Sequence, residues 1–153
     1  MFHPPPGTSG LLVGLAIFFV IGACAYFTRE LGPFNLDPKA KPGAFEPFLV
    51  KYMRVSEFII GLATGSIVLL IGSSALHGQG GRLPWFYASP LLLLAICVVY
   101  GIIFTVWLIY HYEEHQHGVP HTRFAYSLSL TLGFSALACF SVGYIWLILR
   151  VAG

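Results

Sequence analysis

The chain has 153 residues, of which 57% are apolar, 16% aromatic and only 9% charged. A soluble domain typically has about a quarter of its residues charged, so this composition argues against a water-soluble globule and more strongly against intrinsic disorder. Eight lysines and arginines against six aspartates and glutamates leave a net charge of +2, which is too small for a nucleic-acid-binding surface. The expected partner is the lipid bilayer, and no nucleic acid is expected.

Four long apolar segments predict membrane-spanning helices, at about residues 11–27, 58–76, 85–112 and 124–149. A helix needs roughly 20 apolar residues to cross a bilayer. Away from their ends, these segments contain no Asp, Glu, Lys, Arg or His. We therefore expect an all-α, polytopic integral membrane protein, with residues 1–153 forming a single domain that is a four-transmembrane-helix bundle.

Cys24, Cys97 and Cys139 lie within these apolar segments, without the spacing of metal ligands. They are predicted to be small core side chains.

The residues just before the second span predict a short interfacial amphipathic helix. Apolar side chains recur there at helical spacing and share one face: Phe45, Phe48, Leu49, Tyr52 and Met53. Lys51 and Arg54 lie off that face, as in a helix that lies among lipid headgroups. Packing of the same face on a neighbouring subunit explains the pattern equally well.

The distribution of basic residues predicts the orientation in the membrane. Six of the eight lysines and arginines fall in the first and third connections, whereas only Arg82 and Arg150 fall on the other side. Cytoplasmic loops carry the excess of positive charge. Both termini are therefore predicted to be non-cytoplasmic, in a cytoplasmic (inner) membrane.

A cluster of histidines follows the third span. His111 and His115 are four residues apart and share one helical face, which suits two ligands of one metal ion. The candidate ligands of a divalent metal are His111, Glu114, His115, His117 and His121. The alternative is a solvated polar helix end. A haem held by this chain alone is not expected, because spans 1, 2 and 4 contain no histidine to serve as a second axial ligand.

Two further features near the helix ends are candidate interaction sites. Arg54 and Glu57 are three residues apart, so they could form an ion pair at the membrane interface. Glu57 at the start of a helix is also favourable for purely structural reasons. Small residues predict close helix packing, at Gly10 and Gly14 in the first span and at Gly61, Gly65 and Gly72 in the second.

The absence of ionisable residues at hydrocarbon depth argues against a lone ion-coupled transporter. The first functional hypothesis is a small accessory or scaffold subunit of a larger integral membrane complex, such as a respiratory or photosynthetic one, without its own catalytic centre. Its partners would be other membrane subunits or copies of itself. The first alternative is a homo-oligomeric pore or transporter lined by Ser and Thr.

The second alternative is a membrane enzyme that acts on a lipid-soluble substrate at the cytoplasmic face. In length, four-span layout and long first connection, the chain resembles the membrane-associated eicosanoid and glutathione metabolism family. Arg54 and Glu57 fall where that family has Arg and Glu near the start of its second helix. The third connection departs from the family's pattern, with histidines where that family has arginines. The resemblance implies trimers with sites at the cytoplasmic ends of the helices.

Overall fold

The computed structural model describes residues 8–28, 46–73, 84–117 and 123–152. They form four long helices, α1 (Thr8–Thr28), α2 (Glu46–Gly72), α3 (Ala88–Gln116) and α4 (Arg123–Ala152), with a 3-10 turn η2 (Trp85–Tyr87) before α3. All four α-helices are long and apolar enough to cross a membrane. The prediction of an all-helical fold with four candidate spans is confirmed.

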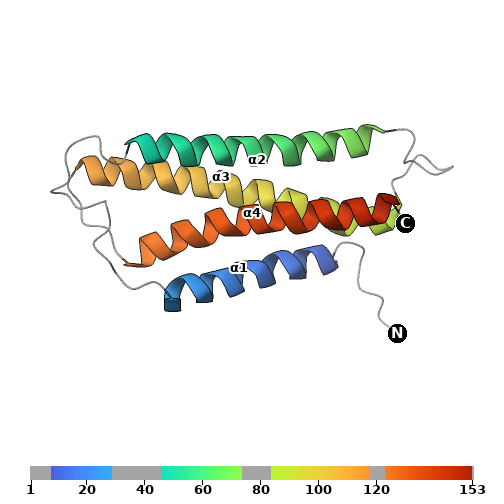
Figure 1. Ribbon diagram of the computed structural model, residues 1–153, viewed down its shortest axis with the longest axis horizontal. Coiled ribbons are helices and arrows are strands. Elements are labelled where there is room, and N and C mark those ends of the chain that lie inside the picture. The colour runs from blue at the N-terminus through green and yellow to red at the C-terminus, as the bar shows by residue number, and fades with distance from the viewer. Residues whose placement is uncertain (1–7, 29–45, 74–83, 118–122, 153) are drawn as a thin grey trace.

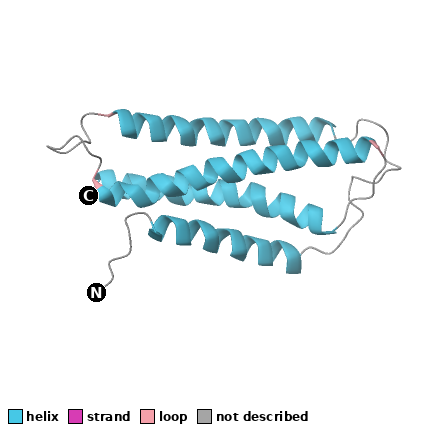
Figure 2. Ribbon diagram, turned by 180° about the vertical axis from the view of Figure 1, so that it is seen from behind, coloured by secondary structure: helices cyan, strands magenta, loops and turns pink. Residues whose placement is uncertain are grey.

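The helices run roughly antiparallel in chain order, with α3 and α4 in the middle (Figure 1). The two views show α1 and α2 on opposite sides of this central pair (Figure 2). The start of α1 and the end of α4 lie at one end of the bundle. The start of α2, the end of α3 and the start of α4 gather at the other end.

The second helix differs most from its predicted bounds. It begins at Glu46 and continues without a break to Gly72, so its first turns replace the separate interfacial helix expected there. Phe45 lies outside the described residues, and so do the side chains at 46–49. The helix ends at Gly72 rather than near residue 76, and glycine followed by serine has a low helix propensity.

The third helix begins later than predicted. Trp85–Tyr87 form the 3-10 turn η2, in which the Tyr87 backbone N–H donates to Pro84 O at 3.1 Å. The α-helix starts at Ala88. Pro90 lies in its first turn, where a missing N–H leaves no helical hydrogen bond unmade.

The core lies between α2, α3 and α4 and contains leucines together with smaller side chains. Leu93, Leu94, Cys97 and Cys139 are fully buried in it. The prediction that the cysteines are core residues is thus right for Cys97 and Cys139, but Cys24 is exposed. The reason is that α1 lies at the side of the bundle and only one of its faces contacts α3 and α4.

Glycine allows two close helix approaches. A side chain at Gly10 would clash with the Ser89 backbone carbonyl, and a Cβ at Gly14 would lie 2.9 Å from Ile96 Cδ1. Two hydrogen bonds reinforce this contact of α1 with α3. One joins Ser9 Oγ and Ser89 Oγ at 2.6 Å, and in the other Tyr100 OH donates to Gly14 O at 3.4 Å. A Cβ at Gly101 would similarly lie 2.8 Å from Ile60 of α2.

Candidate functional site

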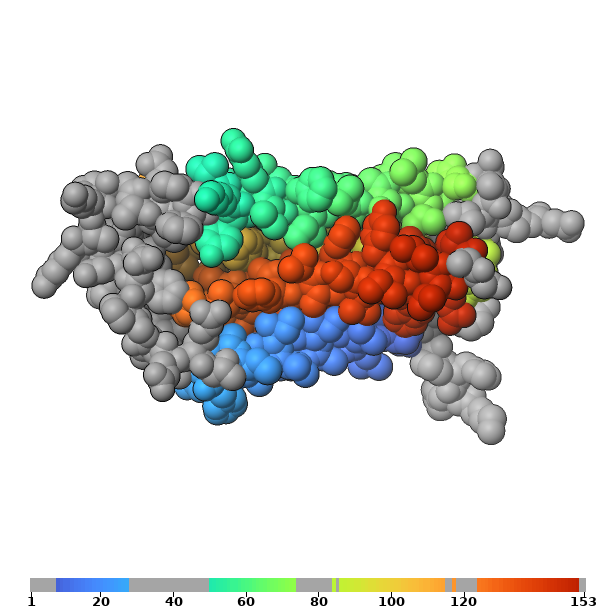
Figure 3. Space-filling model, viewed as in Figure 1, coloured from blue at the N-terminus to red at the C-terminus, as the bar shows by residue number. Residues whose placement is uncertain are grey.

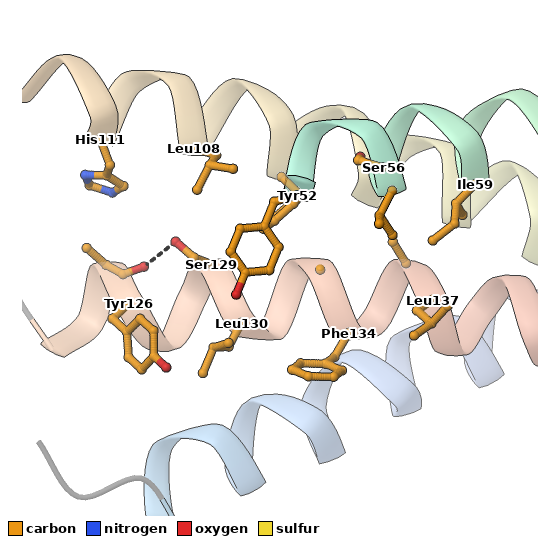
Figure 4. A pocket seen from close by; sticks show the side chains of 15 residues that line it. Tyr52, Ser56, Ile59, Leu108, His111, Tyr126, Ser129, Leu130, Phe134 and Leu137 are labelled. Atoms are coloured by element: carbon orange, nitrogen blue, oxygen red, sulfur yellow. Dashed lines mark hydrogen bonds between the residues drawn. The ribbon is translucent and has the colours of Figure 1, made fainter. Parts of the chain in front are cut away.

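A pocket of about 350 Å³ lies between α2, α3 and α4, near the end of the bundle where α2 and α4 begin (Figure 4). Both helices pack on α3 but contact each other much less. Side chains of α3 are therefore visible between those of α2 and α4 in the space-filling view (Figure 3). Because α2 and α4 stay apart at this end, the α3 face between them is left partly uncovered.

The lining residues recur at helical spacing on each of the three helices. On α2 they run from Tyr52 to Ile59, and on α3 from Phe104 to His111, which is about 10 Å along each axis at 1.5 Å per residue. On α4 they run from Ala125 to Leu137, or roughly 18 Å. The pocket is therefore elongated along α4.

His111 lies at the end of the pocket nearest the start of α4 (Figure 4). Its Nδ1 is 2.7 Å from Glu114 Oε2, one helical turn further along α3. The imidazole also meets the rings of Trp107 and Tyr110 edge-on, with centroids 4.6 Å and 5.6 Å away. These contacts from its own helix hold the ring in one orientation, with Nε2 buried.

Other polar groups at the pocket are held by the helices that carry them. Ser129 Oγ donates to Ala125 O at 2.9 Å, and Trp107 Nε1 donates to the same carbonyl at 3.3 Å. Ser56 Oγ is 3.1 Å from Thr105 Oγ1 and donates to Gly101 O at 3.3 Å. The second set of bonds ties α2 to α3 beside the cavity.

The predicted metal ligands are only partly described by the structure. His111 and Glu114 form the pair above, and His117 is exposed at the end of α3. The His115 side chain and His121 lie outside the described residues. Within the described ranges, no three His, Cys, Asp or Glu side chains are grouped so that they could hold a metal ion.

The predicted ion pair and the predicted packing glycines are only partly in contact with other helices. Arg54 and Glu57 are both exposed on α2, and in the described part of the chain the ion pair present is His111–Glu114 rather than these two. Exposed pairs of long side chains gain little from a fixed geometry. Gly10 and Gly14 contact α3, whereas a Cβ at Gly61, Gly65 or Gly72 would meet nothing within 4 Å.

The pocket itself was not expected from the sequence, and neither were the roles of Tyr126 and Ser129 in its lining. The sequence gives one weak indication of this face, because these two hydroxyl-bearing residues are three positions apart at the start of an apolar span. Tyr52, by contrast, belongs to the amphipathic face predicted before the second span, and it also lines the cavity.

Comparison with models of protein families, with curated proteins and with solved structures finds no match to this chain.

Proposed function

We propose that this chain is a small membrane subunit that binds one lipid-soluble molecule in the pocket between α2, α3 and α4, without a catalytic centre of its own. The pocket carries the proposal. Its volume of about 350 Å³ is at the lower end of the roughly 300–1,000 Å³ of small-molecule sites. Its lining is mainly apolar with a few polar groups at defined positions, which is typical of such sites.

The position of the pocket favours a ligand that arrives from the bilayer. All of its lining residues fall within the three candidate spans Val50–Gly72, Ala88–Glu114 and Phe124–Val151. Several of them are half exposed at the surface of the bundle, among them Tyr52, Val55 and Phe134. In an inserted helix bundle this surface faces lipid, so an apolar molecule can enter sideways.

The same proposal includes membership of a larger membrane complex in an inner membrane. The support is the exposed small-residue surface of α2, formed by Gly61, Gly65 and Gly72, which none of the other described helices covers. Such surfaces commonly pack against another transmembrane helix, here one of a different subunit or of a second copy.

A pore lined by hydroxyl groups has less support. The hydroxyls of Ser66, Ser129, Thr131 and Ser141 each donate to the carbonyl four residues earlier on their own helix. A hydroxyl bound in this way has committed its one proton to its own helix, so it can offer only its oxygen lone pairs to water or a cation.

The test compares two matched serine variants of α4. Ser129 lines the pocket, whereas Ser141 is exposed away from it, and both hydroxyls bond to the carbonyl four residues earlier. We expect Ser129→Phe to fill the pocket, so that the chain loses a bound molecule that the wild type and Ser141→Phe retain. Native mass spectrometry after gentle detergent extraction would measure the bound mass, and would also detect companion chains. Equal retention by the two variants would contradict the proposal.

A further inference from the structure

In an inserted bundle, the pocket begins at one surface of the hydrocarbon layer and ends near the middle of the bilayer. Tyr52 and Ala125 lie within two residues of the ends of their candidate spans. The deepest lining residues are Ile59 on α2, Phe104 on α3 and Leu137 on α4. They lie roughly 14–20 Å from the same ends of their spans, at 1.5 Å per residue, and half of a hydrocarbon core is about 15 Å thick. The pocket therefore extends along one leaflet of the membrane.

The end of the pocket at the membrane surface is its polar end, where His111, Tyr126 and Ser129 lie (Figure 4). Even there, hydrogen bonds are directed into the protein. Ser129 Oγ donates to Ala125 O, and His111 has Nδ1 2.7 Å from Glu114 Oε2 and Nε2 buried. The wall of the cavity thus presents mainly carbon. Hydrocarbon matches it better than a molecule with polar groups along its length, because each polar group would lose its hydration without gaining a partner.

The size of the pocket matches one hydrocarbon chain. A methylene group fills about as much space as a water molecule, roughly 30 Å³, so a cavity of about 350 Å³ holds about twelve carbons. In an extended chain each carbon–carbon bond of about 1.5 Å advances roughly 1.25 Å, so twelve carbons span about 15 Å. Volume and depth therefore agree on the same chain, whereas a fused ring system of equal volume would be shorter and wider.

We propose that the occupant of the pocket is one acyl chain of a bilayer lipid, which lies along α4 with its methyl end near Leu137 and its headgroup outside the polar end. This inference rests on the proposed function, because it names the molecule bound in that pocket. The cavity is open between α2 and α4, where Val55 and Phe134 line it and are more than half exposed. The second chain of the lipid can therefore stay in the surrounding bilayer while the first occupies the pocket.

Concentration favours a bilayer lipid over a scarcer molecule with the same chain. Lipid is the solvent of an inserted bundle, and the occupancy of a site rises with the ratio of ligand concentration to dissociation constant. A lining of carbon recognises hydrocarbon in general, so a free fatty acid or alcohol gains no advantage from its chain. The most abundant chain of the leaflet is therefore the expected occupant.

The experiment maps where a lipid chain reacts with the protein. The full chain would be placed in phosphatidylcholine nanodiscs that contain a small fraction of the same lipid with a diazirine near the methyl end of one chain. Ile59 and Ala136 line the pocket and are buried, so we expect light-induced labels on them from a chain inside it. Phe19, exposed near the middle of the α1 span, reports lipid around the bundle. A diazirine placed near the ester should label Ala125 instead of Ile59 and Ala136.

A matched pair of variants tests whether the labels depend on the pocket. We expect Ser129→Phe to reduce the labels on Ile59 and Ala136, relative to the label on Phe19, about tenfold, which corresponds to about 1.4 kcal/mol of lost binding. Ser141→Phe should leave this ratio unchanged, because Ser141 lies away from the pocket. An equal ratio in the two variants would contradict the proposal.

A second pair keeps the test decisive if Ser129→Phe does not fold. Leu137 and Val142 are both partly exposed on α4, but only Leu137 lines the pocket. Leu137→Trp shortens the cavity at its deep end, so it should remove the label on Ala136 and keep the label on Ala125. Val142→Trp should change neither label, and the same loss in both tryptophan variants would count against a chain inside the pocket.

A free fatty acid that carries the same diazirine chain, at the same mole fraction, tests the source of the chain. Equal or weaker labelling of Ile59 and Ala136 by the fatty acid supports a bilayer lipid. Labelling several-fold stronger than that by phosphatidylcholine would overturn this source, because the carboxyl end would then contribute to recognition.

The two proposals fail in different ways. Loss of a non-lipid mass in Ser129→Phe, with no label on Ile59 or Ala136 in the wild type, would overturn the acyl-chain assignment and leave the binding function standing. Absence of these labels from the wild type, with no bound mass lost in Ser129→Phe, would overturn both.

Discussion

At the scale of single residues, the hydroxyl of Ser56 links α2 to α3. It is buried and reaches both the Gly101 carbonyl and Thr105 Oγ1 on α3. Thr105 Oγ1 also donates to the same carbonyl at 2.9 Å, so three polar groups form one small network. This network joins α2 to α3 at Gly101, where the absence of a side chain allows the two helices to approach closely.

We expect Ser56→Ala to lower the free energy of unfolding by about 1 kcal/mol, since interhelical hydrogen bonds in membrane proteins contribute up to roughly that amount. Ser141→Ala is the control, because Ser141 is exposed and bonds only within its own helix. Its effect should be a few tenths of a kcal/mol. Reversible unfolding in mixed micelles would measure both changes, and equal losses would contradict a specific role for the network.

At the scale of helices, the glycines predicted for close packing on α1 contact α3, whereas those on α2 do not. Gly14 is in contact with Ile96, whereas Gly65 has open space around it. Both belong to a glycine pair four residues apart, so the pattern alone does not tell a surface used within the chain from one left exposed. The difference depends on how each helix is rotated about its axis.

We expect Gly14→Val to destabilise the isolated chain by roughly 1–3 kcal/mol, because overpacking a close contact costs that much. Gly65→Val should change its stability by less than about 0.5 kcal/mol. Thermal unfolding of the purified chain in detergent would show the difference. If Gly65→Val were the more destabilising variant, the helix rotations described here would be wrong.

The helices themselves were predictable from the sequence, because a long apolar run without charges satisfies its backbone hydrogen bonds within one segment when it forms a helix. His111 and Glu114 were also predictable as neighbours, since residues three apart share a helical face. The pocket was not, because it depends on the separation of α2 from α4 at one end. The exposure of Cys24 was not either, because α1 is apolar on all sides and its sequence does not mark the face that packs.

At the scale of the whole molecule, the bundle is a central pair of helices with one helix added on each side (Figure 1). The pocket, the end of α3 and the start of α4 lie at the same end. The orientation of the bundle therefore decides which side of the membrane the polar end of the pocket faces. The distribution of Lys and Arg favours the cytoplasmic side.

Cysteine labelling would test this orientation. In a background with Cys24 replaced by Ser, we expect Pro5→Cys to react with a membrane-impermeant reagent added outside intact cells. His117→Cys, at the exposed end of α3, should react only after the cytoplasmic side is opened. The reverse labelling pattern would mean that the pocket lies toward the non-cytoplasmic side.

The placement of α1 and α2 on opposite sides of the α3–α4 pair has a consequence for how the protein is made. During synthesis the first two helices leave the ribosome before the surfaces that they will contact have been translated, and in the finished bundle they do not pack on each other. We expect them to remain separate segments, joined by residues 29–45, until the second half of the chain has been made. Assembly is thus expected to begin from the C-terminal hairpin and proceed outward, against the order of translation. Chains released early would consequently expose two unassembled helices to membrane quality-control proteases.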